Sequence, residues 1–289
     1  ICILGLFYFR TRISTKDKYY GVFIGISKED GIKLNNYEVL ALEPTEYDKD
    51  DIKKLHEKNK KIYAYLNIGS LENYRPYYEE FKDKTLGAYE NWKDEYWMDV
   101  SDKNWQNLIV NDLGKSIADK GFDGFFIDNC DVYYQFENEK IFGGLCSILK
   151  ALRKYNLNTI INGGDTFVSK CIDEKNEKEM FDGVNQECVF TSIDFENKKF
   201  GEKSAKDREY FIQYLNKAKD EYAELEKEVN DKINYLSKKN NIAKDKFSYV
   251  ITSNGDAISY NGKTELLKDI NIKENIETNN SNTLDTEVN

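Results

Sequence analysis

Three polar side chains, Asp128, Asn129 and Asp131, follow directly on an apolar run in the segment 121–131, GFDGFFIDNCD. The run 125–127 lacks polar alternation, which is typical of a strand buried on both faces. Ionised carboxylates crowded beside an apolar core carry a cost of desolvation and mutual repulsion. We therefore interpret this strand end as a functional site.

A second acid, Glu187, ends the strand-like segment 181–190. Two carboxyl groups at one barrel mouth can cleave a glycosidic bond, with Asp128 attacking the anomeric carbon as an ionised nucleophile. Glu187 is flanked by Val184 and Val189. Desolvation there would raise its pKa, so that it acts as the acid and then as the base. The alternative for either acid alone is a structural ion pair or a helix cap.

Several other catalytic mechanisms require a residue or motif that this sequence does not place suitably. The single histidine, His56, lies on a predicted helix as a surface or half-buried residue. Histidine–metal hydrolysis and Ser-His-Asp catalysis are therefore excluded. Neither G-x-S-x-G nor a P-loop occurs, and no lysine ends a predicted strand. Two hypotheses remain, a carboxylate pair without cofactor, or an acid cluster of Asp128 and Asp131 that holds Mg²⁺.

Alternating segments must position these residues. Strands are predicted at 20–26, 37–44, 61–70, 121–128, 158–163 and 181–190, with helices at 48–61, 101–121, 141–152 and from 204 onward. Polar residues recur at the strand ends: Glu43, Asn67, Asp128, Asn162 and Glu187. This placement favours a (β/α)₈ TIM barrel, whose active site lies at that rim. No G-x-G-x-x-G follows the first strand, which disfavours a doubly wound nucleotide-binding fold.

The amino-acid composition of the chain limits the classes of ligand that it is expected to bind. The 289 residues carry a net charge of −10, which excludes nucleic acid and favours a neutral or cationic ligand. Five cysteines without C-x-x-C spacing indicate neither a zinc site nor a disulfide framework. The apolar block in residues 1–18, ICILGLFYFR, is too short to span a bilayer. We interpret it as the remnant of a signal peptide or N-terminal anchor, with a buried first strand as the alternative.

Several motifs in order carry a family resemblance. They are YAYLNIGSLENYRPYY (63–78), GAYENW (87–92), GFDGFFIDNCDVYY (121–134), IINGGD (160–165) and DGVNQECVFTS (182–192). Over residues 19–219 the chain resembles the endo-α-1,4-polygalactosaminidase family of glycoside hydrolases. The resemblance implies a TIM barrel in an exported, extracellular or cell-surface enzyme that cuts α-1,4-linked galactosamine polymers. It also implies Asp128 and Glu187 as the catalytic pair. Free amines on such polymers suit an acidic site.

Further motif residues are predicted to bind the sugar. They are Glu43, Tyr65, Asn67, Glu72, Tyr74, Arg75, Trp92, Trp97, Asn129, Asp131 and Asn162. Each has a structural alternative: Arg75 can pair with Glu72, and the tryptophans can cover the rim of the barrel. Asn162, before Gly163, can belong to a tight turn. Glu43 stands where relatives commonly carry Asp.

One departure from the family affects the barrel itself. After Lys219 the pattern passes directly into another helix, so the seventh strand is missing and only 247–252 remains as a late strand. We therefore predict a barrel domain at 19–260, incomplete around the seventh strand, and a polar disordered tail at 261–289. Besides the glycosidase and the metal-dependent enzyme, a catalytically impaired carbohydrate-binding barrel remains a hypothesis.

Overall fold

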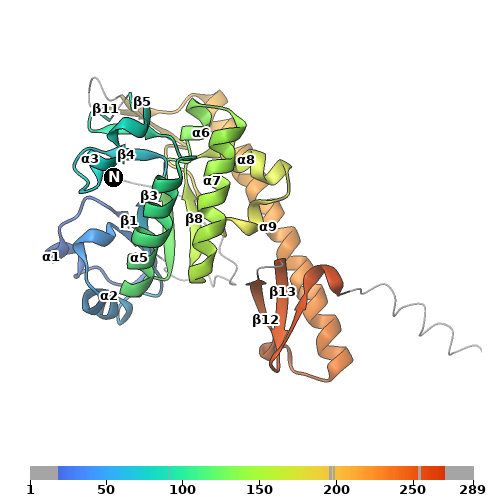
Figure 1. Cartoon of the computed structure of the whole chain (residues 1–289). Coiled ribbons are helices and arrows are strands. Elements are labelled where there is room, and N and C mark those ends of the chain that lie inside the picture. Colours follow the sequence, from blue (N-terminus) through green and yellow to red (C-terminus); the bar gives the residue numbers. More distant parts are fainter. Residues whose placement is uncertain (1–18, 91, 195–196, 198, 253–254, 271–289) are drawn as a thin grey trace, which may run out of the picture. The chain divides into compact units, whose positions relative to one another are not determined.

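The computed structural model describes residues 19–90, 92–194, 197, 199–252 and 255–270 (Figure 1). The chain divides into two compact units, with the boundary between Lys219 and Asp220. The barrel-like unit is therefore shorter than the predicted domain 19–260. The predicted signal or anchor at 1–18 lies outside the described residues.

A six-stranded parallel sheet forms the first unit and is an incomplete TIM barrel, as predicted. Its order is β1 (Tyr19–Phe23), β2 (Tyr37–Leu42), β3 (Ile62–Asn67), β7 (Gly124–Asp128), β8 (Asn158–Asn162) and β9 (Gly183–Asn185). All five pairings are parallel, so every strand presents its carboxyl end at the same edge. The sheet contains no seventh strand among the residues described here.

Helices connect the strands, and those within 48–61, 101–121 and 141–152 are the ones that the 3.6-residue pattern predicts. They are α1 (Lys28–Gly31), α2 (Lys49–His56), α3 (Tyr78–Phe81), α4 (Lys103–Asn107), α5 (Gly114–Lys120), α6 (Val132–Gln135), α7 (Glu139–Leu152) and α8 (Asp165–Asp173). A π-helical segment, Leu108–Leu113, joins α4 to α5. Gly121 ends α5 at φ 91°, a left-handed conformation that glycine adopts without strain. His56 ends α2 half-buried, with Nε2 3.1 Å from the Gly121 carbonyl.

One face of the sheet holds an apolar cluster that fixes where the polar strand ends point. The cluster contains Val39, Ala41, Tyr63, Tyr65, Phe126 and Ile160. Side chains two residues apart on a strand lie on the same face. Asp128 and Asn162 follow Phe126 and Ile160 by two positions, so they continue this face at the carboxyl edge.

Two small antiparallel sheets in the first unit are not predicted from the sequence. The first has the order β4 (Ser70–Glu72), β6 (Glu95–Met98) and β5 (Thr85–Ala88). The second is the hairpin of β10 (Thr191–Asp194) and β11 (Lys199–Glu202). The predicted strand 181–190 is therefore reduced to β9, and Glu187 lies in the connection between β9 and the hairpin.

The second unit corrects the prediction for the C-terminal region. Helix α9 (Ala205–Asn240), which begins before the boundary of the two units, is continuous where two helices were expected, and the Ser204 hydroxyl accepts from the Asp207 N–H in its first turn. The late strand is β12 (Ser248–Thr252), but it pairs antiparallel with β13 (Gly255–Tyr260), which pairs with β14 (Lys263–Leu266). It is therefore no member of the parallel sheet.

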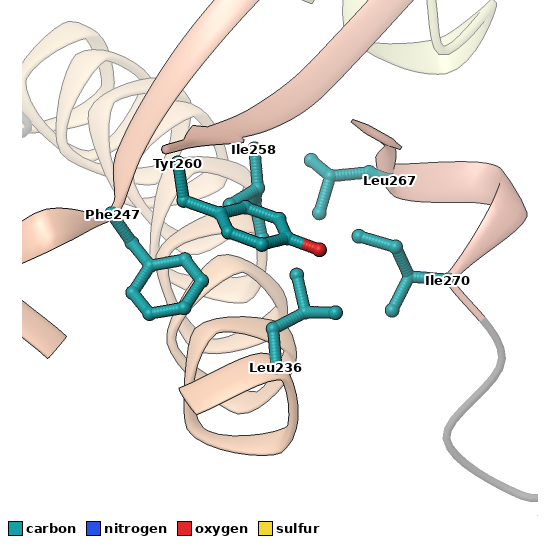
Figure 2. Packing of buried hydrophobic residues seen from close by; sticks show 6 residues of the cluster. All are labelled: Leu236, Phe247, Ile258, Tyr260, Leu267 and Ile270. Atoms are coloured by element: carbon teal, nitrogen blue, oxygen red, sulfur yellow. The ribbon is translucent and has the colours of Figure 1, made fainter. Parts of the chain in front are cut away.

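The predicted tail also differs in its first residues. Leu267 and Ile270 are buried against Leu236, Phe247, Ile258 and Tyr260 (Figure 2). These apolar residues are sparse in a polar sequence, but a helix and three strands bring them together, so residues 263–270 are ordered. Residues 271–289 lie outside the described part. No helix in the described residues is long and apolar enough to cross a membrane.

Candidate active site

The strand register brings the polar ends of four strands together. Asn67 of β3 is opposite Asp128 of β7, and Asn162 of β8 is opposite Asn185 of β9. Neighbouring strands in a sheet are about 4.8 Å apart, so side chains on one face can hydrogen-bond across them. The carboxyl edge therefore gathers residues that are up to 118 positions apart, which is the difference between 185 and 67.

The Asn162 amide connects the two predicted catalytic acids. Its Nδ2 donates to Asp128 Oδ1 at 3.0 Å and to Glu187 Oε1 at 3.3 Å. The separation of these two oxygens cannot exceed the sum of the two distances. The two acids therefore share one site.

Asp128 is partly buried and accepts two side-chain hydrogen bonds. Tyr65 Oη donates to its Oδ2 at 2.9 Å, and Asn162 donates to its Oδ1. Burial raises the pKa of Asp128 above its ordinary value, while the hydrogen bonds from Asn162 and Tyr65 oppose this rise. Both donors stabilise the ionised carboxylate.

Glu187 lies in a different environment, although it shares the same donor. The residue as a whole is exposed, but its carboxyl group lies close to surrounding protein atoms. This local desolvation, and then the negative charge of Asp128, raise the pKa of Glu187 above its ordinary value. The hydrogen bond from Asn162 is the one opposing influence on its ionisation. Glu187 therefore holds a proton more readily than an isolated glutamate does.

Asp131 is a third acid on this edge, after the turn that follows β7. Its Oδ2 accepts a hydrogen bond of 3.0 Å from the Gly164 backbone N–H. Burial, and then the negative charge of Asp128, raise the pKa of Asp131 to about 7. Asp131 thus accepts from a main-chain amide at the start of α8, and its ionisation depends on the charge of Asp128.

The protein is expected to lose stability as the pH rises through the pKa of Asp131. The substitution Asp131→Asn is expected to abolish this loss. A pKa of about 7 against 3.8 when unperturbed means that the folded protein binds this proton more tightly than the unfolded chain. The free energy of unfolding must therefore fall between pH 3.8 and 7, by a few kcal/mol. The asparagine oxygen can still accept from Gly164. We expect the fall in Tm from pH 5 to pH 8 to be smaller in Asp131→Asn.

The control for this experiment is Asp112→Asn, at an exposed aspartate of the π-helical segment. It should show the same pH dependence of Tm as the unmodified chain. An Asp131→Asn protein whose Tm falls as steeply as the unmodified chain would contradict the assignment of this dependence to Asp131.

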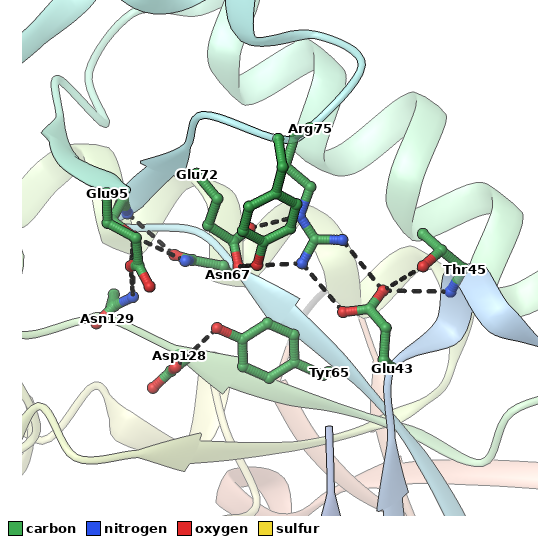
Figure 3. Close-up of polar contacts among 11 residues, drawn as sticks. Glu43, Thr45, Tyr65, Asn67, Glu72, Arg75, Glu95, Asp128 and Asn129 are labelled. Carbon is green, nitrogen blue, oxygen red and sulfur yellow. Dashed lines mark hydrogen bonds and ion pairs between the residues drawn. The ribbon is translucent and has the colours of Figure 1, made fainter. Parts of the chain in front are cut away.

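Three of the predicted sugar-binding residues, Glu43, Glu72 and Arg75, form ion pairs with one another. Arg75 donates to Glu43 at 3.1 and 3.0 Å and to Glu72 at 2.5 and 3.1 Å (Figure 3). Thr45 adds two hydrogen bonds to Glu43, and Tyr74 Oη donates to Glu72 at 2.7 Å. The structural alternative for Arg75 thus describes its observed contacts. The longer Glu43 side chain suits it to accept both Arg75 nitrogens.

A second network supports the loop that carries Asn129. Asn67 Nδ2 donates to Ser70 Oγ at 2.7 Å, and Ser70 Oγ donates to Glu95 Oε2 at 2.7 Å (Figure 3). Asn129 Nδ2 donates to the same Ser70 oxygen at 3.0 Å. Asn129 has φ 64°, and its carbonyl oxygen would lie 1.7 Å from a Cβ at Gly69. Asn67 and Asn129 therefore have structural partners, and only glycine fits at position 69.

Glu95 was missed by the sequence analysis. Burial raises its pKa, and the charges of Glu72 and Asp128 add to this effect, whereas the hydrogen bond from Ser70 opposes it. Glu95 begins β6, a short strand without a buried apolar run before it. In the sequence Glu95 lies three residues after the motif GAYENW (87–92) and two before Trp97. This position was available as a signal, but no strand end was predicted there.

Aromatic side chains lie beside the acids. Trp97 is buried at 3% exposure and stacks on Tyr89 with ring centroids 4.0 Å apart, so it supports the rim as the structural alternative proposed. Trp92 and Tyr74 are exposed, at 50% and 66%. Tyr89 was quoted in a motif but not chosen as a site residue. Burial raises its pKa, and the negative charges of Asp131, Asp128, Glu95 and Glu187 add to this rise.

The described residues contain no group of three or more His, Cys, Asp or Glu side chains arranged to hold a metal ion. Asp128 and Glu187 both accept hydrogen bonds from the Asn162 amide. Asn185, which donates to Asn162 Oδ1 at 2.5 Å, is a further residue that the sequence analysis missed.

Solved structures of two glycoside hydrolases are similar to this chain. The glycoside hydrolase domain of PelA from Pseudomonas aeruginosa has a similar fold, with 15% identity, a TM-score of 0.55, and coverage of 68% of this chain and 76% of that domain. Ega3 from Aspergillus fumigatus, solved in complex with galactosamine, is 20% identical with a TM-score of 0.42, over 50% of this chain and 64% of Ega3. No curated protein matches the sequence significantly.

The model of one protein family matches residues 16–282, which is most of the chain and includes both predicted catalytic acids. This match extends beyond residues 19–219, over which the motifs were recognised. The chain belongs to glycoside-hydrolase family GH114 and is a glycosidase.

Proposed function

We propose that this glycosidase is an endo-acting, retaining enzyme that hydrolyses α-1,4-linked galactosamine polymers. Asp128 is the nucleophile and Glu187 is the acid and then the base. The observation that carries the proposal is the position of one amide nitrogen, Asn162 Nδ2, within hydrogen-bonding distance of both carboxyl groups.

The two roles follow from the hydrogen bonds of each acid. Asp128 receives side-chain donors from both Tyr65 and Asn162, which favour the anion that a nucleophile requires. Glu187 shares the Asn162 donor at a longer distance and lies beside the charge of Asp128, which favours its protonated form. A general acid must carry a proton when the leaving oxygen departs, so Glu187 suits this role.

The separation of the carboxyl groups supports retention of configuration. Retaining glycosidases place them about 5–5.5 Å apart, whereas inverting enzymes need about 6.5–9.5 Å to admit a water. Both carboxyl groups accept from one amide nitrogen, at 3.0 and 3.3 Å, and this closeness favours the retaining arrangement. Glu187 would protonate the leaving oxygen as Asp128 forms the glycosyl ester, and would then remove a proton from the water that hydrolyses this ester.

The choice of substrate rests on motifs and charge. The sequence motifs resemble those of polygalactosaminidases, and the chain carries a net charge of −10. The pKa of Tyr89 is raised by burial and then by the negative charges of Asp131, Asp128, Glu95 and Glu187. Protonated amines of a deacetylated polymer would be attracted to this acidic edge, whereas the phosphates of nucleic acid would be repelled. A polymer of this kind is encountered outside the cell, so we propose an extracellular or cell-surface location.

Product analysis after incubation with defined α-1,4-galactosamine oligomers tests the proposal. Proton NMR of the earliest products should show the α-anomer, and chromatography should show internal cleavage of the longer oligomers. Addition of EDTA should leave the rate unchanged. An initial β-anomer would contradict retention, and a rate that depends on added Mg²⁺ would favour a metal-dependent reaction.

A carbohydrate-binding protein without turnover is the second candidate. The observation in its favour is the six-stranded sheet, which lacks a seventh strand in the described residues. It predicts that oligomers bind, as calorimetry would measure, while no product forms during prolonged incubation.

A further inference from the structure

The orientation of the Asn162 amide decides whether the two acids meet a donor or an acceptor. With Nδ2 toward Asp128 and Glu187, both carboxylates receive a hydrogen bond. Rotation of this amide by 180° would place Oδ1 there instead, and an oxygen facing two carboxylates is repelled by both. Something must therefore hold the amide in the first orientation.

Asn185 supplies this hold from the neighbouring strand. Its Nδ2 donates to Asn162 Oδ1 at 2.5 Å, and the two residues are register partners on β8 and β9. The backbone of Asn185 is itself fixed, since its carbonyl accepts from the Gly163 N–H at 2.9 Å. With the Asn185 amide in the orientation observed, rotation of Asn162 alone would bring two NH₂ groups face to face and break this bond.

The burial of Asn185 points to a role beyond packing. The residue is completely buried, and its Oδ1 has no hydrogen-bond partner among the described residues. An unpaired buried acceptor is unfavourable, and an apolar side chain of similar size would avoid the cost. The one side-chain hydrogen bond that Asn185 makes here is the bond to Asn162, so that bond is what the asparagine adds over an apolar residue.

We propose that Asn185 is a positioning residue, which orients the Asn162 amide so that its N–H groups face both acids, keeping Asp128 ionised and limiting how tightly Glu187 holds its proton. The inference rests on the proposed function for the roles of the two acids. Asn185 touches neither carboxyl group in the described contacts and acts through Asn162. Without it, the amide can present oxygen to the acids, and the pKa of both must rise.

Asn185→Leu tests this inference, because leucine has a similar volume and no donor. We expect kcat to fall by about 10–100-fold, as is typical when a residue that orients a functional side chain by a hydrogen bond is replaced. KM should change by less than about threefold. Both limbs of the pH–rate profile should move to higher pH. The matched control is Asn158→Leu, at the exposed amino end of β8, where the profile should remain unchanged.

Asn185→Asp gives a second, chemically distinct test. Its carboxylic acid can donate to Asn162 Oδ1 only while it is protonated. On the acid limb, the activity of Asn185→Asp relative to Asn185→Leu should therefore be greatest at the lowest pH and fall as the pH rises. A purely structural role would lower Tm and kcat in both variants without moving the pH profile, and this result would overturn the inference.

Carbon-13 NMR titration of the carboxyl carbons provides a readout that needs no turnover. The pKa of both Asp128 and Glu187 should be higher in folded Asn185→Leu than in the unmodified chain. Unchanged values would overturn the positioning role even if the enzyme is inactive. Conversely, activity that survives Asp128→Asn would remove the proposed function, whatever the Asn185 variants do.

Discussion

Asp128→Asn is expected to abolish hydrolysis of α-1,4-galactosamine oligomers, with kcat at least about 10⁴-fold lower, while the protein remains folded. The asparagine nitrogen cannot attack the anomeric carbon, so no glycosyl ester forms. Tyr65 can still donate to the asparagine oxygen, and the similar volume preserves the packing against β3 and β8. The rate is measured by chromatography of the products, and folding by Tm.

Removal of the Asp128 charge should also change its neighbour. That charge contributes to the raised pKa of Glu187, so the pKa of Glu187 should be lower in Asp128→Asn. Because burial already raises the pKa of Asp128, we expect the Tm at pH 7 to stay equal or increase.

The matched control is Asp119→Asn, an exposed aspartate on α5 that pairs with Lys115. It should keep unmodified activity. A folded Asp128→Asn protein that retains a tenth of the activity would refute the nucleophile role.

Glu187→Ala has the second largest expected effect, a loss of about 10²–10⁴-fold on oligomers, which require protonation of the leaving oxygen. An aryl glycoside should lose far less in the first step, because a phenolate leaves without a proton. Hydrolysis of the glycosyl ester then becomes slow, since no base activates water. Azide needs no base, so we expect it to accelerate turnover and give an α-glycosyl azide.

The product is identified by NMR, and the control is Glu202→Ala, at an exposed residue of β11. If azide accelerates Asp128→Asn and gives an α-glycosyl azide, while Glu187→Ala gives none, the two roles must be exchanged. If it accelerates neither variant on an aryl glycoside that the unmodified enzyme cleaves, the double-displacement mechanism is wrong.

Local sequence was sufficient for the strands that carry the site. The apolar run before Asp128 could only be a buried strand, and a residue two positions beyond Phe126 must share its face. Gly121 marked a helix end because its left-handed conformation is an effect of the chain's own geometry. The acids were therefore recognisable from neighbours within a few residues of each, and the helices from their periodicity.

Partners distant in the sequence were not recognisable in this way. Glu43 and Arg75 pair across 32 positions, and Asn162 and Asn185 across 23. No local pattern states which hydrogen-bonding group of an asparagine faces which neighbour. The same limit applies to the C-terminal region, where 248–252 was correctly predicted as a strand but its antiparallel partner was not.

The sequence by itself determined that an acid, Asp128, stands at the end of a buried strand, that a barrel strand is missing, and that carboxylate chemistry is available. Only the tertiary structure decided that one amide nitrogen joins Asp128 to Glu187 and that a buried asparagine orients it. The physical reason is range. Strand formation and side-chain alternation depend on residues a few positions apart, whereas ionisation and hydrogen bonding depend on distances in space, which strand pairing sets.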